Sequence, residues 1–296
     1  MIEFSIIICT YNNSSMLEDT LASLDAVSIS NIELELIIVD NNSTDETRGV
    51  VEKYQTSGRI QTRYVFEEKQ GLAIARNTGV RYACAEIIIF TDDDILFDKR
   101  FLKEIRDTFT ISKASAVGGR ILLQFPKQKP NWLSDRVDYM YGKMDLGVKN
   151  MEFPLHTSPL GPCIAIRRNM FNQYGLFDEE LGLAGSKEVL RRGEETEFVE
   201  RLRKRGEKIF YSGNALVLHR VQLNRLNKPW FYQRFKYEGA VRGAVTSKLS
   251  LFWWMSLCKL LIVNILGMFG TIIGNPKLEF YGKCKAIYFL GVISNG

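Results

Sequence analysis

Three short apolar runs in the first hundred residues share one pattern. They lie at residues 4–9, 34–40 and 86–92, and polar residues bound each of them. Nearly continuous apolar runs of this length are typical of strands that are buried on both faces, as in parallel sheets. The pattern therefore predicts three buried parallel strands.

Segments with helical spacing lie between and after these runs. In the first of them Leu17, Leu21 and Leu24 fall on one helical face. The alternation of strand and helix predicts an open, doubly wound α/β sheet, in which ligands bind beyond the carboxyl ends of strands. Those ends are residues 10–12, 40–42 and 92–94. The helical segments are residues 14–27, 43–54, 71–83, 99–109 and 194–205.

The second half of the chain is less regular. Residues 118–166 contain Pro, Trp and Gly without sustained periodicity, and we interpret them as a substrate-facing region. A short strand is expected at residues 215–219, and the chain is expected to be helical from Pro229 onward. Within that helical part lies a long apolar stretch at residues 251–273.

This apolar stretch is long enough to cross a bilayer. Lys259 near its middle is costly for a spanning helix, whereas Trp253 and Trp254 suit the headgroup region. Three alternatives stay open: an interfacial or monotopic helix, a transmembrane span and a buried core helix.

Composition limits the class of protein. Hydrophobic residues make up 46% and charged residues 25% of the 296 residues, which is typical of a folded globular chain. The five cysteines are scattered without a Cys-x-x-Cys pair, so neither a disulfide framework nor a zinc site is indicated. The N-terminal run lacks the basic segment of a signal peptide, and we expect a cytoplasmic location.

Charge is unevenly distributed along the chain. The formal net charge is +5, but residues 220–296 contain eleven Lys/Arg and two Asp/Glu, which leaves the preceding part acidic. A basic tail indicates an anionic partner, either a membrane surface or nucleic acid. The aromatic residues of the tail lie in apolar runs rather than between basic residues, so we expect a membrane surface and no nucleic acid. This charge also favours the interfacial alternative for residues 251–273.

Three adjacent carboxylates, Asp92, Asp93 and Asp94, end the third predicted strand. They would repel one another strongly without a cation. Oxygen ligands favour Mg2+ or Mn2+ over Zn2+, and Mg2+ commonly binds carboxylates together with substrate phosphates. Side chains alternate along an extended segment, so Asp92 and Asp94 are expected to face one way and Asp93 another. The alternative is a solvated acidic turn that caps the next helix.

Polar residues also follow the second predicted strand and open the helix after it. Asp40 and Asn42 belong to a cluster that fits either a helix cap or contacts with a base or ribose. The helix that starts at Gly71 carries Arg76 and Asn77, which are placed to meet a nucleotide. A plain surface charge is the alternative for Arg76.

Four motifs are specific in their order and spacing. They read Ser-Ile-Ile-Ile-Cys-Thr-Tyr-Asn at 5–12, Ile-Ile-Val-Asp-Asn-Asn-Ser-Thr-Asp at 37–45, Gly-Leu at 71–72 with Ala-Arg-Asn at 75–77, and Phe-Thr-Asp-Asp-Asp at 90–94. Together they resemble family 2 glycosyltransferases of the GT-A fold, over roughly residues 3–220. The resemblance implies an α/β fold with a Rossmann-like, mostly parallel sheet and flanking helices.

The expected domain organisation follows from this resemblance. A glycosyltransferase domain would cover residues 1–222, with a nucleotide-sugar-binding half at 1–95 and an acceptor-binding half at 96–222. A basic, helical, membrane-associated tail would cover residues 223–296.

The same resemblance implies roles for individual residues. Residues 10–12 and Asp40 would bind the nucleobase side of a nucleoside diphosphate sugar. Asp92 and Asp94 would form a DxD-type site for Mn2+ or Mg2+, and His219 resembles a position that completes the coordination, with a structural histidine as the alternative. The full set of expected donor-binding residues is Thr10, Tyr11, Asn12, Asp40, Asn42, Gly71, Arg76, Asn77, Asp92 and Asp93.

The segment Gly-Glu-Glu-Thr-Glu-Phe at residues 193–198 resembles the family's acidic segment, whose second acid is the usual catalytic base. By position this base is Glu195, which would take the proton of the attacking acceptor hydroxyl. Glu194 and Glu197 are alternatives, and a further one is that these acids only complement a helix dipole. Residues 161–168 resemble the family's strand beside the acceptor.

These residues together predict a sugar transfer. The donor is expected to be a UDP-sugar, and the acceptor a saccharide or lipid-linked saccharide in polysaccharide biosynthesis at the cytoplasmic side of the cell membrane. The resemblance implies inversion at the anomeric carbon. A sugar nucleotidylyltransferase is a second class, but it normally needs a Gly-rich basic loop that residues 10–15 do not provide. A nucleotide-binding module without catalysis is a third, and the intact acids argue against it.

Overall fold

The computed structural model describes residues 2–181, 193–244 and 250–295. The chain forms two compact units, each described separately below. Unit 1 contains Met1–Leu122 and Gly142–His219, and unit 2 contains Leu123–Tyr141 and Arg220–Gly296. Residues 123–141, which the sequence placed in the first domain, therefore group with the C-terminal part. The expected domain boundary at residue 222 itself stays a prediction.

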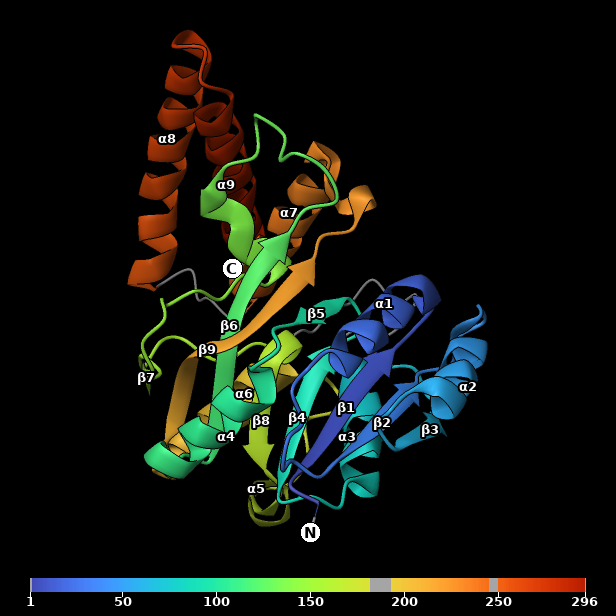
Figure 1. The fold of residues 1–296 in the computed structure, drawn as a ribbon. Coiled ribbons are helices and arrows are strands. Elements are labelled where there is room, and N and C mark those ends of the chain that lie inside the picture. Colours follow the sequence, from blue (N-terminus) through green and yellow to red (C-terminus); the bar gives the residue numbers. More distant parts are fainter. Residues whose placement is uncertain (1, 182–192, 245–249, 296) are drawn as a thin grey trace. The chain divides into compact units, whose positions relative to one another are not determined.

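One mixed sheet runs through the described part of the chain. Its strands are β1 (Phe4–Thr10), β2 (Leu34–Asp40), β3 (Thr62–Phe66), β4 (Ile87–Asp92), β5 (Ile95–Phe97), β6 (Ala116–Gln124), β7 (Met151–Glu152), β8 (Ile164–Arg167) and β9 (Ile209–Arg220). Their order is β3-β2-β1-β4-β8-β6-β9-β5, and β7 pairs with β9 (Figure 1). The pairs β1–β2, β1–β4 and β2–β3 are parallel, whereas β8 is antiparallel to β4 and β6, and β9 to β5 and β7.

The expectation of a mostly parallel sheet is therefore met only by β1 to β4. The later strands lack the long continuous apolar runs that the sequence analysis used. Strand β9 alternates buried and half-buried residues over its second half, which is typical of an antiparallel strand with one covered face. The strand predicted at residues 215–219 is the end of β9, which begins at Ile209.

Helices cover both faces of the parallel part of the sheet. They are α1 (Ser14–Asp25), α2 (Thr47–Ser57), α3 (Leu72–Tyr82), α4 (Phe101–Ser112), α5 (Arg168–Tyr174) and α6 (Glu194–Lys204). Phe4, Ile6 and Ile8 of β1 belong to a core with α1, α2 and α4. Ile7 belongs to a second core with α3, α5 and α6. Because strand side chains alternate, β1 is buried on both faces, as its continuous apolar run predicted.

The helix predicted from residue 43 begins only at Thr47. The backbone N–H of Thr44 donates to Oδ1 of Asn12 at 2.7 Å, and the Asp45 carboxylate accepts from the backbone N–H groups of Ser14 and Thr47. Residues 43–46 therefore form a loop that is bound to the end of β1. The sequence pattern alone did not separate this loop from the helix.

Unit 2 has its own aromatic core. It is built from a 3-10 helix at Asp135–Tyr141 and from α7 (Lys228–Ala244) and α9 (Pro276–Asn295), whereas α8 (Leu251–Ile272) packs against α9. The ring of Trp132 lies edge-on to Phe280 at 4.7 Å and to Phe231 at 6.1 Å. The sequence left open whether Trp132 stacks on a sugar, and the structure places this half-buried ring against the core of unit 2.

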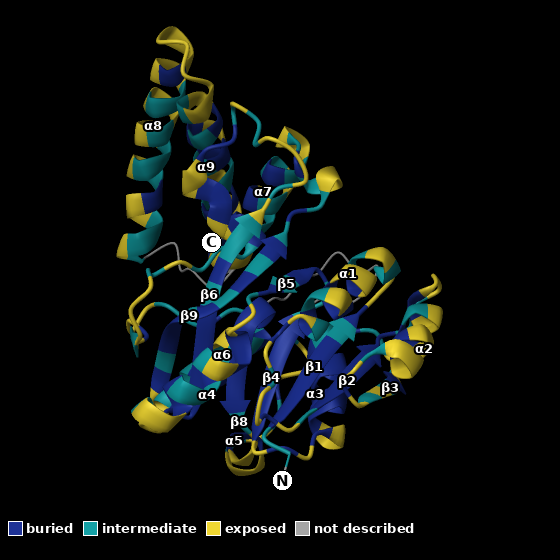
Figure 2. Cartoon of the chain, viewed as in Figure 1, coloured by how far each residue is buried: buried dark blue, intermediate teal, exposed yellow. Residues whose placement is uncertain are grey.

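Helix α8 is exposed and apolar. Among the described residues it is the one helix long and apolar enough to cross a membrane. Only 11% of its most apolar 18-residue stretch is buried (Figure 2). Leu261 and Ile265 are each 67% exposed and Ile272 is 79% exposed. The alternative of a buried core helix is therefore wrong.

Glycines bring α9 close to both neighbouring helices. A Cβ atom at Gly282 would lie 2.6 Å from the Cα of Gly267 in α8, and one at Gly291 would lie 3.0 Å from the Cα of Gly239 in α7. Neither position has room for a side chain without movement of the backbone. Helices that approach so closely through small residues are common in lipid-embedded bundles.

Candidate active site

Two carboxylates and an imidazole meet at the carboxyl end of β4. Asp92 is the last residue of β4, Asp94 lies in the turn before β5, and His219 of β9 is paired with Ile95 of β5. One ligand atom from each of Asp92, Asp94 and His219 lies within 4.8 Å of the others. Nε2 of His219 is 3.1 Å from Oδ1 of Asp94. The structure thus brings together the three residues that the sequence analysis grouped as metal ligands.

These three residues fit a hard divalent cation. Oδ1 of Asp94 is buried and accepts no hydrogen bond from the described residues, which is costly for a carboxylate oxygen. Burial raises the pKa of Asp92; Arg76 opposes this shift and the Asp94 carboxylate adds to it. A cation would supply the missing partner, and carboxylate oxygens with one imidazole suit Mn2+ as well as Mg2+.

Asp93 faces away from this cluster, as strand alternation predicted. Its carboxylate accepts hydrogen bonds from the Thr10 hydroxyl and from Nδ2 of Asn13, both at 2.6 Å. Burial and the neighbouring Asp94 raise the pKa of Asp93 to about 7, and the two hydrogen bonds oppose the shift. Asp93 therefore ties the end of β1 to the end of β4. The contribution of Asn13 was not recognised from the sequence.

The ends of β1 and β2 form one polar loop cluster. Asp40 is buried and accepts from the Tyr64 hydroxyl at 2.7 Å and from the backbone N–H of Ser43 at 2.9 Å. Asn12 and Asn42 adopt φ angles of 49° and 69°, a left-handed conformation that asparagine tolerates better than most residues. Tyr11, which directly follows β1, is 47% exposed. Residues expected at the nucleobase side are thus neighbours in space.

Gly71 joins this loop cluster to α3. Its φ of 152° favours glycine, and its backbone N–H donates to Oδ1 of Asn41 at 2.8 Å. Nδ2 of Asn41 in turn donates to the backbone carbonyl of Lys69 at 2.8 Å. The start of α3 is therefore fixed by the loop that follows β2.

Arg76 is buried among acids instead of lying on the surface. It is 3% exposed, and its Nη1 pairs with Glu194 through a short contact. The same Nη1 is 3.5 Å from Oε2 of Glu195, and Nη2 is 3.6 Å from Oδ1 of Asp92. The alternative that Arg76 is a plain surface charge is wrong. One guanidinium thus contacts Asp92 of the candidate cation cluster and two of the acids that open α6.

Three acids in the first turn of α6 differ sharply in environment. Glu194 is 2% exposed, and its burial raises the pKa of its carboxyl group while Arg76 opposes the shift. The side chain of Glu195 is 17% exposed, and its Oε1 accepts from the backbone N–H of Gly161 at 3.3 Å. Glu197 pairs with Arg201 along the helix. Glu195 is therefore the more accessible of the two acids beside Arg76.

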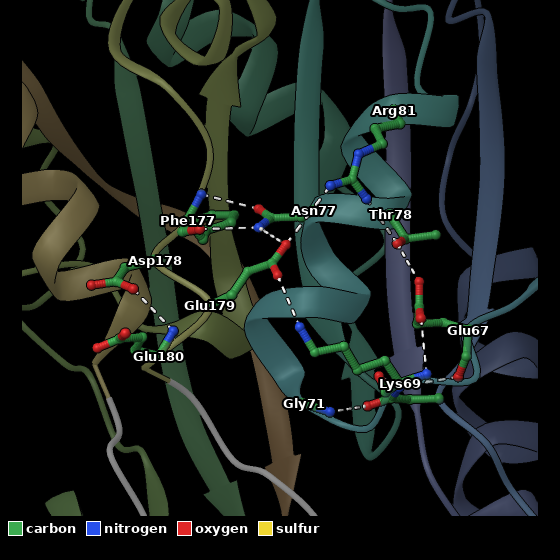
Figure 3. A network of polar contacts seen from close by, with 11 residues as sticks. Glu67, Lys69, Gly71, Asn77, Thr78, Arg81, Phe177, Asp178, Glu179 and Glu180 are labelled. Carbon is green, nitrogen blue, oxygen red and sulfur yellow. Dashed lines mark hydrogen bonds and ion pairs between the residues drawn. The ribbon is translucent and has the colours of Figure 1, made fainter.

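Asn77 contacts a segment that the sequence analysis did not single out. Its amide donates to the backbone carbonyl of Phe177 and accepts from the Phe177 N–H, both at 3.0 Å (Figure 3). Nδ2 also lies 3.2 Å from Oε1 of Glu179. No local pattern links two positions 100 residues apart in the chain, so this contact had no signal in the sequence.

Solved structures show the same fold. Mannosyltransferase PcManGT from Pyrobaculum calidifontis, solved in complex with GDP-Man and Mn2+, matches with a TM-score of 0.68 at 16% identity, over 99% of this chain and 86% of that chain. Residues 1–349 of TarS from Staphylococcus aureus, solved in complex with UDP-GlcNAc, match with a TM-score of 0.54 at 18% identity, over 99% and 90% of the two chains. The fold is the GT-A fold that the sequence predicted.

Sequence comparison gives the family. Succinoglycan biosynthesis protein ExoM of Rhizobium meliloti is 25% identical over 244 residues, which are 81% of this chain and 74% of that protein. Validoxylamine A glucosyltransferase of Streptomyces hygroscopicus subsp. jinggangensis is 35% identical over 103 residues, and these span only 24% of its length. The family model described as Glycosyl transferase family 2 matches residues 5–175, more than half of the chain. The chain belongs to glycosyl transferase family 2.

Proposed function

We propose that the chain transfers a sugar from a nucleoside diphosphate sugar to an acceptor hydroxyl, with inversion at the anomeric carbon. The observation that carries this proposal is the grouping of Asp92, Asp94 and His219 with an accessible Glu195, joined through the buried Arg76. A diphosphate and an attacking hydroxyl need these two kinds of group side by side. Family membership supports the proposal and argues against a sugar nucleotidylyltransferase.

The donor would lie along the carboxyl ends of β1, β2 and β4. Residues 10–12, Asp40 and Asn42 are neighbours there and would bind the nucleoside, which we propose to be uridine. The TarS structure, which holds UDP-GlcNAc, supports this choice, whereas the mannosyltransferase structure holds GDP-Man. Backbone and side-chain polar groups of this loop cluster would orient the base and ribose.

Asp92, Asp94 and His219 would hold Mn2+ or Mg2+ and place the diphosphate. When bound, the cation supplies positive charge beside the departing diphosphate. Glu195 would take the proton of the acceptor hydroxyl while the hydroxyl oxygen bonds to the anomeric carbon and the bond from that carbon to the diphosphate breaks. Glu194 is buried against Arg76 and would keep the guanidinium in place rather than act as the base.

We propose further that residues 223–296 bind the cytoplasmic surface of the cell membrane, and that the acceptor is a saccharide or lipid-linked saccharide of polysaccharide biosynthesis. The exposed side of α8 carries apolar side chains from Leu251 to Ile272. Lys259 lies on the helical face of Val263 and Gly267, which approach α9, so its charge does not interrupt the exposed side. The basic composition of the tail suits an anionic leaflet.

The hairpin formed by α8 and α9 favours peripheral or monotopic binding over a span. A short turn at Gly274 and Asn275 joins the two helices, so a spanning α8 would draw α9 into the bilayer beside it. That helix carries Lys277, Lys283 and Lys285, which are expensive in hydrocarbon. An in-plane helix would bury the exposed side of α8 and leave these lysines near headgroups.

Thermal unfolding of the purified protein tests the proposed function. We expect UDP, UDP-GlcNAc or another uridine nucleotide to raise the melting temperature in the presence of Mn2+ and much less without it, because ligands of the native state stabilise it. A shift with GDP or GDP-Man instead would mean that the donor is a GDP-sugar rather than a UDP-sugar. If no nucleotide shifts the unfolding of a folded sample, the proposed transfer is wrong. Binding without transfer to any acceptor would favour the nucleotide-binding module.

A further inference from the structure

The consecutive residues Arg76 and Asn77 of α3 contact two separate parts of the acceptor side. The sequence predicts that both contact a nucleotide, but in this chain their polar atoms are engaged elsewhere. We propose that they are positioning residues: Arg76 aims Glu195, and Asn77 holds the segment at residues 177–179. This inference rests on the proposed function, in which Glu195 is the base.

Arg76 has little freedom to serve a ligand. Both of its Nη atoms face carboxylates, one toward Glu194 and Glu195 and the other toward Asp92. The backbone of Gly161 lies directly against Nη2, so closely that a Cβ atom there would collide with it. Removing one partner of a buried ion pair leaves an uncompensated charge, which is strongly destabilising. The guanidinium is therefore held in place, and it fixes the acids around it.

Glu195 is held from two sides as a result. Its Oε2 faces Nη1 of Arg76 at 3.5 Å, and its Oε1 accepts from the N–H of Gly161 at 3.3 Å. Gly161 is itself packed on the guanidinium of Arg76. Both contacts that orient the Glu195 carboxylate thus depend on one arginine. Each carboxylate oxygen keeps a further lone pair, which would accept from an acceptor hydroxyl.

The side-chain amide of Asn77 binds the backbone of Phe177 with both a donor and an acceptor, as a neighbouring strand would. It is 1% exposed, and both its donor and its acceptor atoms are used by Phe177 (Figure 3). Glu179 next to it lies 3.5 Å from Nζ of Lys69 and 3.7 Å from Nη2 of Arg81. The ring of Phe177 packs edge-on against Phe90 of β4 at 5.2 Å. The segment is fixed to both α3 and β4.

Helix α3 thereby connects the loop after β2 (residues 41–46), which we call the donor loop, to Glu195 and the segment at residues 177–179 on the proposed acceptor side. Its first residue follows Gly71, which Asn41 of the donor loop holds. All of its residues from Ala73 to Val80 are buried, so the helix is tightly packed in unit 1. Arg76 and Asn77 then set where the base and residues 177–179 stand relative to the donor.

Replacement of Arg76 by Lys tests the proposal, with UDP and Mn2+ as the binding probe. Lysine keeps the charge but lacks the planar fork that contacts three carboxylates. We expect kcat for transfer to fall about 30-fold, within the 10- to 100-fold range typical of losing a supporting contact, while UDP affinity in Mn2+ stays within about twofold. A large loss of UDP affinity with unchanged kcat would overturn the proposal and make Arg76 a nucleotide ligand.

A double variant guards against simple misfolding. Arg76→Gln with Glu194→Gln removes both charges of the buried pair, and hydrogen exchange can be read without any substrate. We expect faster exchange in residues 193–198 than in the wild type, and unchanged exchange in residues 41–46 of the donor loop. Unchanged exchange in residues 193–198 would contradict the proposal even if the wild type transfers no sugar. If the wild type transfers no sugar, by contrast, only the proposed function is contradicted.

Asn77→Ala addresses the second half of the proposal, with Tyr82→Phe as the matched control on the same helix. Tyr82 is 45% exposed and its ring contacts Arg63, so we expect this variant to change transfer by less than about twofold. Asn77→Ala should raise the KM for acceptor by about tenfold and leave UDP affinity unchanged, since it frees residues 177–179 only. Weakened UDP binding in this variant would instead assign Asn77 to the donor.

Discussion

The carboxyl end of β4 in unit 1 and helix α8 in unit 2 depart from the usual distribution of residues in opposite ways. At β4, charged groups such as Asp94 and Arg76 are buried. Along α8, large apolar groups such as Ile265 and Met268 are exposed. Buried charge and exposed apolar surface are the informative exceptions in a folded protein, because each is costly until a partner covers it. The first suits a cation and a diphosphate, and the second suits lipid.

The largest effect is expected from Glu195→Gln, which removes the proposed base but keeps the size of the side chain. Transfer should fall by about 1,000-fold, because general base catalysis contributes about 100- to 10,000-fold. UDP affinity in Mn2+, measured by calorimetry, should stay within about twofold. Glu52→Gln on the exposed face of α2 is the control. If Glu197→Gln abolishes transfer and Glu195→Gln does not, the base has been assigned to the wrong acid.

Asp94→Asn should have the next largest effect, on binding instead of transfer chemistry. It removes the buried carboxylate beside His219, and we expect UDP affinity in Mn2+ to fall by at least about 100-fold, because losing even an outer contact of a metal costs 10- to 100-fold. Affinity without Mn2+ should hardly change. Asp107→Asn on the surface of α4 serves as control. Equal Mn2+ dependence in wild type and Asp94→Asn would exclude this cluster as the cation site.

Cysteine labelling tests the proposed membrane contact of α8, and it uses cysteines that the chain already contains. Cys258 lies exposed on α8, and Cys84 lies exposed in unit 1. Vesicles with anionic lipid should slow maleimide labelling of Cys258 by about tenfold, since an in-plane helix buries its apolar side. Cys84 is the internal control: its hydrogen bond with Glu35 raises the pKa of the thiol, which slows labelling equally with and without vesicles. Equal protection of both, or of neither, would contradict docking through α8.

The smallest effect is expected from Gly282→Ala in α9. Its Cβ would meet Gly267 of α8 at 2.6 Å, so the helices must move apart, at a cost of about 1–3 kcal/mol in the stability of unit 2. Gly49→Ala in α2 is the control, because a Cβ atom there would meet only Glu46, at 3.6 Å. This replacement should stabilise the helix slightly, since alanine favours helices more than glycine does. Faster hydrogen exchange in α8 and α9 with unchanged UDP binding is the expected result. Unchanged exchange would mean that the close contact is not required.

The sequence predicted the first half of the fold well because continuous apolar runs mark the buried strands there. Strand β2 spans residues 34–40 as expected, and β1 and β4 differ from the prediction by one residue at an end. Short strands such as β5 and β7 carry too few residues for a period to be visible. The antiparallel part also depends on pairings between distant segments, such as β5 with β9, which no local pattern specifies.

For the candidate site, the sequence pointed to residues that the structure brings together, but not to all of their contacts. The grouping of Asp92 and Asp94 followed from strand alternation, and the structure places them together with His219. The burial of Arg76 between two sets of acids had no local signal, because Glu194 lies 118 residues further along the chain. Motifs show which residues recur at a site, whereas the tertiary fold decides which of them face a ligand.

The ion pair between Arg76 and Glu194 also limits how this enzyme can be recombined with its relatives. A chimera joined between these two positions would take its arginine from one parent and its acid from the other. Parents with different residues at either position would yield a chain with one buried charge left over and a misplaced Glu195. New acceptor specificity is therefore better introduced by exchanging residues outside this pair than by exchanging whole halves.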